Sequence, residues 1–140
     1  MCKQLTATVP VLQLLARVVP TLRPAGIDDT KISKDPAVVA AYRADPLVHH
    51  GNPTLGLSSA LFGQFDVLRR RAAGLRLPVL LQYGTLDELA DPAGSYALER
   101  ACGSPDLTVH RYDGLWHEIY NAPERAAPLG DLRAWLAAHR

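Results

Sequence analysis

The amino-acid sequence predicts an α/β protein in which a largely helical N-terminal half is followed by a short parallel sheet. Two short apolar runs, Pro78–Tyr83 and Leu107–Tyr112, are bounded by turn residues and read as strands. A helical pattern follows each run, and this alternation of strand and helix implies neighbouring parallel strands with helices packed on them. Two strands are too few for a finished sheet, so we expect the sheet to be incomplete.

Composition excludes several classes of protein. The 140 residues are enough for one core, and 48% hydrophobic residues argue against disorder. Fifteen basic and fourteen acidic side chains give a formal charge of +1. The longest basic run is Arg69–Arg71, which we interpret as the solvated face of a helix. We therefore expect no nucleic-acid partner.

Cysteine usage and the N-terminal segment bear on location. Cys2 and Cys102 are far apart and form no CxxC pair, which favours a reduced protein. The apolar stretch Val9–Val19 is interrupted by Gln13 and Arg17, has no cleavage site after it, and is shorter than the ~20 residues that span a bilayer. The sequence predicts a cytoplasmic protein.

The first half contains three predicted helices. Val9–Val19, closed by Pro20, is apolar nearly all round and should be covered by another element, a partner or lipid. Asp35 is a good N-cap before Pro36, so a helix is predicted over Pro36–Ala44, ending before Asp45-Pro46. The third helix lies within Pro53–Ala73, where apolar residues form one stripe at helical spacing: Leu57, Leu61, Phe65, Leu68 and Ala72.

The second half supplies two further helices. One is predicted over Pro92–Cys102, opened by Asp91 as its N-cap. The last is predicted to start near Pro123, with a buried side made of Leu132, Trp135 and Leu136. Pro128 would be about the sixth residue of that helix and would break a backbone hydrogen bond at a cost of roughly 3 kcal/mol. Gly130 would add about 1 kcal/mol.

Two polar residues follow the two predicted strands. Asp87 comes shortly after Pro78–Tyr83, and His117 comes shortly after Leu107–Tyr112. The carboxyl ends of neighbouring parallel strands meet at one edge of a sheet, so both side chains are expected there. A carboxylate that binds one imidazole nitrogen leaves the other nitrogen able to take a proton from a hydroxyl nucleophile. Taken singly, Asp87 is more often explained as a turn or capping residue, and His117 as a surface residue or one with a structural hydrogen bond.

Three segments carry a family resemblance. Pro78–Ser95 and Tyr112–Arg125 resemble the acid and histidine motifs of the monoacylglycerol lipase and lysophospholipase group of α/β-hydrolases, often described as serine-aminopeptidase-like. Ile32–Gly51 resembles the lid, or cap, of the same group. The resemblance covers nearly all of the chain from about Ile32, and acid before histidine is the order that α/β-hydrolases use.

The resemblance implies a fold, an activity and a site. Residues 1–73 would be a helical cap segment, and residues 74–140 the C-terminal part of an α/β-hydrolase core. The intact enzyme would hydrolyse lipid-like acyl esters, without metal or organic cofactor, and its cap could touch a membrane peripherally. Asp87 takes the acid position in preference to Glu88 and Asp91, and His117 takes the position of the base.

The nucleophile of that group is not found. The sequence contains no G-x-S-x-G elbow; the nearest stretch, Gly56–Ala60, lacks the second glycine and lies in a helical stripe. The 140 residues alone should therefore be inactive. The chain could be completed by a separate N-terminal hydrolase half, or it could be a binding module that self-associates.

Two smaller observations complete the sequence analysis. Tyr83 stands where the family usually has the histidine of an HG dipeptide. His49 and His50, with Asp45 nearby, are not interpreted as metal ligands because adjacent side chains diverge and no ligand cluster accompanies them.

Overall fold

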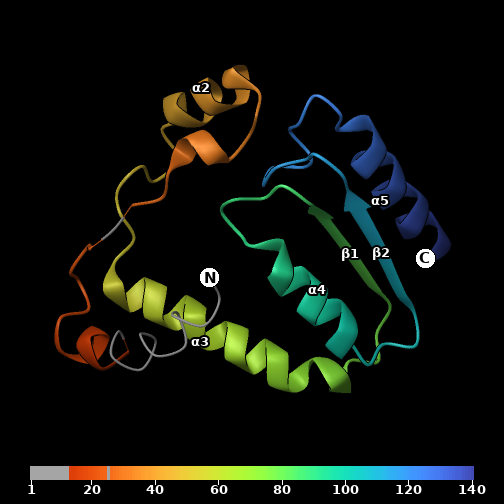
Figure 1. Ribbon diagram of the computed structural model, residues 1–140, viewed down its shortest axis with the longest axis horizontal. Helices are drawn as coiled ribbons and strands as arrows, with labels where there is room; N and C mark the ends of the chain where they lie inside the picture. The colour runs from red at the N-terminus through yellow and green to blue at the C-terminus, as the bar shows by residue number, and fades with distance from the viewer. Residues whose placement is uncertain (1–12, 25) are drawn as a thin grey trace. The chain divides into compact units, whose positions relative to one another are not determined.

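The computed structural model describes residues 13–24 and 26–140. These residues form two compact units, one containing His50–Arg70 with the chain up to Ile27, the other containing Asp28–His49 and Arg71–Arg140. The regular elements are labelled in Figure 1, and those with assigned bounds are η1 (Asp29–Lys31), α2 (Pro36–Ala44), α3 (Leu55–Arg71), η2 (Ala72–Gly74), β1 (Val79–Gly84), α4 (Pro92–Ala101), β2 (Leu107–Tyr112) and α5 (Ala126–Ala138).

The first unit joins a short helix to the start of α3. Residues 13–18 are helical and a turn follows at Pro20, as predicted, whereas the predicted beginning at Val9 lies outside the described residues. The backbone N–H of Leu55 donates to the carbonyl of Leu22 at 2.7 Å, and that of Gly56 donates to Pro20 at 2.9 Å. A Cβ at position 56 would come within 3.2 Å of the Pro20 oxygen, so glycine permits this close approach.

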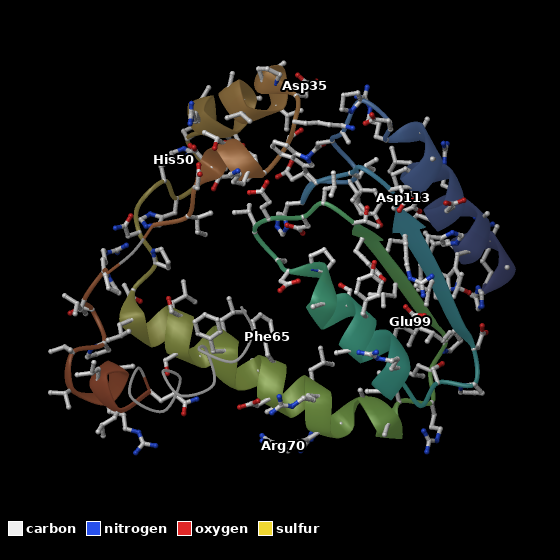
Figure 2. The ribbon with its side chains drawn as sticks, viewed as in Figure 1. Asp35, His50, Phe65, Arg70, Glu99 and Asp113 are labelled. Carbon is white, nitrogen blue, oxygen red and sulfur yellow. The ribbon has the colours of Figure 1, made fainter. Side chains whose placement is uncertain are left out.

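The apolar stripe of α3 is exposed. Leu57, Leu61, Phe65 and Leu68 all show large exposed fractions, and Figure 2 labels Phe65 on this helix. The neighbouring segment of the same unit also exposes Leu14, Leu15 and Val18. Of the predicted stripe, only Ala72, in the 3-10 turn after α3, is buried. The first unit therefore presents an apolar surface.

Helix α2 has the predicted bounds. Asp35 caps it, with its carboxylate accepting from the Ala37 N–H at 2.8 Å, and Pro36 occupies the first turn. Ile32 and Ser33, just before this helix, are buried within the second unit. The second unit therefore includes residues from both sides of the predicted boundary between residues 73 and 74. The assignment of residues 1–73 as a cap stays a prediction.

The two predicted strands pair in parallel, as the fold class required. Their register runs from Val79 opposite Leu107 to Gly84 opposite Tyr112, and they form a two-stranded sheet within the described residues. Side chains alternate between the faces of the sheet. Gln82 reaches the Pro128 carbonyl of α5, whereas Tyr83 packs on Tyr96 of α4. Helices α4 and α5 therefore cover opposite faces of the sheet (Figure 1).

Helix α4 begins at Pro92, as predicted. Its N-cap is Asp91, whose carboxylate accepts from the Ala93 N–H at 2.9 Å, and Pro92 follows in the first turn. The helix ends at Ala101, with Cys102 as the C-cap.

Helix α5 corrects three predictions. It begins at Ala126 rather than near Pro123, so Pro128 is its third residue. The first-turn N–H groups of a helix have no intrahelical partner, and the predicted loss of a hydrogen bond at Pro128 is therefore wrong. Pro128 is instead a fully buried packing residue. Leu136 is exposed rather than part of the buried side, while Leu132 and Trp135 are half-buried.

Candidate active site

The loop after β1 holds the carboxylate of Asp87 in one orientation. One oxygen, Oδ1, accepts from the backbone N–H groups of Leu89 at 2.8 Å and Ala90 at 2.9 Å. The side chain is only 10% exposed. Both hydrogen bonds fix the orientation of the carboxylate, and they leave Oδ2 available to a further donor.

That donor is His117. Its Nδ1 lies 2.8 Å from Oδ2 of Asp87, which confirms the predicted juxtaposition. The carboxylate can only accept, so Nδ1 carries the proton and Nε2 of a neutral ring keeps its lone pair. The His117 side chain is 44% exposed, and no group in residues 13–24 or 26–140 forms a hydrogen bond with Nε2. This nitrogen can therefore accept a proton from a group that approaches from outside.

Backbone hydrogen bonds join the two loops. The N–H of Thr85 donates to the Tyr112 carbonyl at 3.1 Å, and the N–H of Leu86 donates to Leu115 at 3.0 Å. In return, the N–H of Gly114 donates to the Thr85 hydroxyl at 3.2 Å. Gly114 has a φ of +79°, a conformation that glycine adopts without strain, so the chain can turn sharply toward His117.

The other nearby carboxylates have different partners. Glu88 forms an ion pair with Lys31 at 2.6 Å, and Asp91 caps α4 as predicted. Glu118 accepts from the Asn121 side-chain amide at 2.6 Å, within its own loop. Asp87 is thus the carboxylate that contacts His117, and its catalytic role remains a prediction.

A polar network under the histidine loop was not predicted. The hydroxyl of Tyr120 donates to Oε1 of Gln82 at 2.7 Å, while Nε2 of Gln82 donates to the Tyr112 hydroxyl at 2.5 Å and the Pro128 carbonyl at 3.0 Å. Tyr112 donates in turn to Asp131 at 2.9 Å. Gln82 therefore ties β1 to the histidine loop, to β2 and to α5. Its one sequence signal was a lone polar residue within an apolar strand.

The central hydroxyl of this network, that of Tyr112, is protonated at neutral pH and donates to Asp131. Burial raises the pKa of Tyr112 to about 12, and hydrogen bonding to the Asp131 carboxylate also raises it.

Tyr83, the departure from the family pattern, belongs to the opposite face. Its hydroxyl accepts from Nε of Arg111 at 3.0 Å, and Arg111 also pairs with Glu99 of α4, labelled in Figure 2. The Tyr83 ring packs edge-on against Tyr96, with centroids 5.5 Å apart. Burial raises the pKa of Tyr83. Its side chain thus holds α4 on the sheet and does not take part in the Asp87–His117 pair.

A cavity of about 650 Å³ lies beside the histidine loop. It is lined by Trp116, the residue before His117, and by α2 and the segment before it, including Lys34 and Arg43. Its volume is in the range of small-molecule sites.

Within the described residues, no group of three or more His, Cys, Asp or Glu side chains is placed to hold a metal ion. In the same part of the chain, no helix is both long and apolar enough to cross a bilayer.

Comparisons with known proteins identify the family of the chain. Residues 3–124 match the family model described as "Serine aminopeptidase, S33". The monoacylglycerol lipase of Mycolicibacterium smegmatis is 40% identical over 134 residues, covering 93% of this chain and 48% of that protein. The monoglyceride lipase of Rattus norvegicus is 30% identical, covering 96% of this chain and 45% of that protein.

A solved structure, the monoacylglycerol lipase of Paleococcus ferrophilus, superposes with a TM-score of 0.87 at 30% identity, covering 95% of this chain and 52% of the other. The chain thus spans about half the length of the relatives it matches. It matches the C-terminal part of the monoacylglycerol lipase-like group of α/β-hydrolases. The chain belongs to the serine aminopeptidase S33 family.

Proposed function

We propose that this chain contributes the acid and the base of a serine ester hydrolase that acts on monoacylglycerol-like lipids. The observation that carries the proposal is the 2.8 Å contact between Nδ1 of His117 and Oδ2 of Asp87 at the carboxyl ends of β1 and β2. The fixed carboxylate, the ordered tautomer and the accessible Nε2 are what a general base for a serine hydroxyl requires.

His117 and Asp87 have different roles in the proposed reaction. Nε2 of His117 takes the proton of a serine hydroxyl as its oxygen attacks the ester carbonyl, and Asp87 stabilises the imidazolium that forms. The imidazolium then protonates the leaving alcohol. Water, deprotonated by the same nitrogen, attacks the acyl-enzyme and releases the fatty acid, and the imidazolium returns its proton to the serine oxygen. The sequence contains no G-x-S-x-G elbow, so the proposal assigns the serine and the oxyanion donors to a further polypeptide segment.

Two observations favour a lipid-like ester as the substrate. The relatives named above are monoacylglycerol and monoglyceride lipases. The first unit also exposes apolar side chains on residues 13–18 and α3, a surface suited to an acyl chain or to peripheral contact with a membrane. The cytoplasmic location belongs to the proposal as well.

The test is complementation. The portion of the M. smegmatis relative that this chain does not cover would be fused to it or mixed with it, and release of fatty acid from a monoacylglycerol would be measured. We expect hydrolysis and fluorophosphonate labelling only when both parts are present. His117→Ala should lower kcat by about 10⁶-fold and Asp87→Asn by about 10⁴-fold, by analogy with other serine hydrolases.

Asp91→Ala is the matched control, because it removes a neighbouring carboxylate that does not touch His117. It should leave kcat within about twofold of the unaltered fusion, since its cost falls on the start of α4. Activity of the isolated chain that disappears in His117→Ala would contradict the need for a second segment. A fusion whose activity survives His117→Ala would refute the proposed base.

A further inference from the structure

A four-residue segment far from β1 and β2 in the sequence contacts both loops of the candidate site. This segment, Lys31–Lys34, starts at the last residue of η1 and precedes α2. It is 80 or more residues away from the histidine loop along the chain, so its contacts there are purely tertiary. All of these residues belong to the second compact unit.

Lys31 binds the acid loop. Its Nζ lies 2.6 Å from Oε2 of Glu88, the residue directly after Asp87. The ammonium is charged at neutral pH, and the hydrogen bond to Glu88 raises the pKa of Lys31 further. The contact restrains the backbone that presents Asp87.

Ile32 and Lys34 bind the histidine loop on both sides of His117. The carbonyl of Ile32 accepts from the N–H of Glu118 at 3.0 Å, one residue after the histidine. Lys34 pairs with Glu124 at 2.7 Å and donates to the carbonyl of Gly114, before the histidine, at 3.4 Å. The Lys34 hydrogen bond lowers the pKa of Glu124, which keeps this pair ionised.

Burial fixes the segment between these contacts. Ile32 is 4% exposed and Ser33 is 3% exposed. The Ser33 hydroxyl accepts from the Asp35 N–H at 3.1 Å, which closes a turn just before α2. The two lysines therefore extend from a short anchored base in which little conformational freedom remains.

We propose that Lys31 and Lys34 are positioning residues that set the separation of the Asp87 and His117 loops. This inference rests on the proposed function, because the separation of the two loops matters for catalysis only if Asp87 and His117 are the acid and the base. The side chains of Lys31 and Lys34 are 35% and 34% exposed, so each ion pair contributes little to global stability. Their effect falls on the geometry of the acid–base pair, where small displacements matter most.

The experiment measures the ring ¹⁵N shifts of His117 in the 140-residue chain by NMR, at a pH where the imidazole is uncharged. The unaltered chain should show mainly the Nδ1–H tautomer, because Asp87 accepts that proton. Lys31→Met and Lys34→Met should each lower the ratio of Nδ1–H to Nε2–H tautomer by about twofold or more, and the double variant by more.

Arg43→Met is the matched control. It removes an ion pair with Asp29 at 2.5 Å, close to the same segment, and within the described residues no hydrogen bond or ion pair joins Arg43 to either loop. We expect it to leave the tautomer ratio unchanged. Lys31→Glu should disturb the ratio and Lys31→Glu with Glu88→Lys should restore it. Lys34→Arg should keep it, and this conservative variant also serves should the methionine variant fail to fold.

Two results would overturn the inference: an unchanged ratio in folded Lys31→Met and Lys34→Met variants, or an equal change in Arg43→Met. These outcomes do not depend on activity. A complemented enzyme that is inactive while the lysine variants shift the tautomer would refute the proposed function alone.

Discussion

Gly84, the last residue of β1, lies directly against the carbonyl of Leu115 in the histidine loop. A Cβ built on Gly84 would be 2.3 Å from the Leu115 oxygen and 2.5 Å from that of Trp116. These are backbone atoms, which cannot rotate away as a side chain can. The absence of a side chain at position 84 is thus what lets the two loops approach closely enough for Asp87 to reach His117.

Gly84→Ala should lower the free energy of unfolding by about 2 kcal/mol, because the two loop backbones must separate to admit the methyl group. Urea unfolding followed by circular dichroism measures the change. Gly94→Ala in α4 is the control: a Cβ at that position would meet no atom within 4 Å, so it should stabilise the chain by about 0.5–1 kcal/mol. A Gly84→Ala variant as stable as Gly94→Ala would contradict the close approach.

The two aspartates of the acid loop should respond differently to substitution. Asp91→Ala removes an N-cap and should cost about 1 kcal/mol of stability without changing the His117 tautomer. Asp87→Asn keeps an acceptor for the backbone N–H groups but can present an amide donor to Nδ1, which should shift the ring toward Nε2–H. Ring ¹⁵N shifts report both variants, and a tautomer change in Asp91→Ala instead would reverse the assignment.

His139 predicts a dependence of stability on pH. Its Nδ1 contacts the Trp135 carbonyl at 2.7 Å and its Nε2 contacts Asp106 at 2.9 Å. Both partners are acceptors, so both nitrogens donate only when the ring is protonated. The backbone hydrogen bond to Trp135 and then the Asp106 carboxylate raise the pKa of His139 above its ordinary value of 6.5, against the opposing effect of desolvation.

A histidine whose pKa is higher in the folded state stabilises the fold fully below its unfolded value, and the contribution disappears as pH rises through the folded value. His139→Gln should therefore lower the melting temperature at pH 5.5 and change it little at pH 9. Asp106→Asn should weaken the same dependence by removing the charged acceptor. An equal loss at both pH values in His139→Gln would show that packing on Trp135, and not charge, holds the ring.

Gln82→Leu should destabilise the histidine loop and its surroundings by about 1–3 kcal/mol, because the Tyr120 hydroxyl and the Pro128 carbonyl each lose a hydrogen-bond partner. Tyr120→Phe removes one donor alone and should cost about 1 kcal/mol. Chemical denaturation measures both variants. If Gln82→Leu unfolded at the same midpoint as the unaltered chain, the hydrogen bonds of Gln82 would not contribute to stability.

The isolated chain should associate in solution. Within the described residues, β1 is paired only along the edge it shares with β2, and a free edge of this kind templates further pairing. Light scattering at increasing protein concentration should show oligomers or aggregates. A monodisperse monomer that melts cooperatively would count against this expectation.

Much of the fold could be predicted from local signals. The starts of α2 and α4 follow from an aspartate before a proline, because the carboxylate and the missing N–H of proline both suit the first turn of a helix. The strands follow from short apolar runs between turn residues. The meeting of Asp87 with His117 was predictable as well, since parallel neighbours bring the loops at their carboxyl ends together.

Other features depended on contacts between residues far apart in the sequence. Nothing near Lys31 indicates that it pairs with Glu88, and nothing near Gln82 indicates that it meets Tyr120. The start of α5 also shifted to Ala126, which changed Pro128 from an expected break into a buried residue. The sequence by itself determined the elements and the order of the acid and the base, because caps and periodicity act over a few residues. Only the tertiary structure decided what holds the two loops in place, because those partners are set by packing.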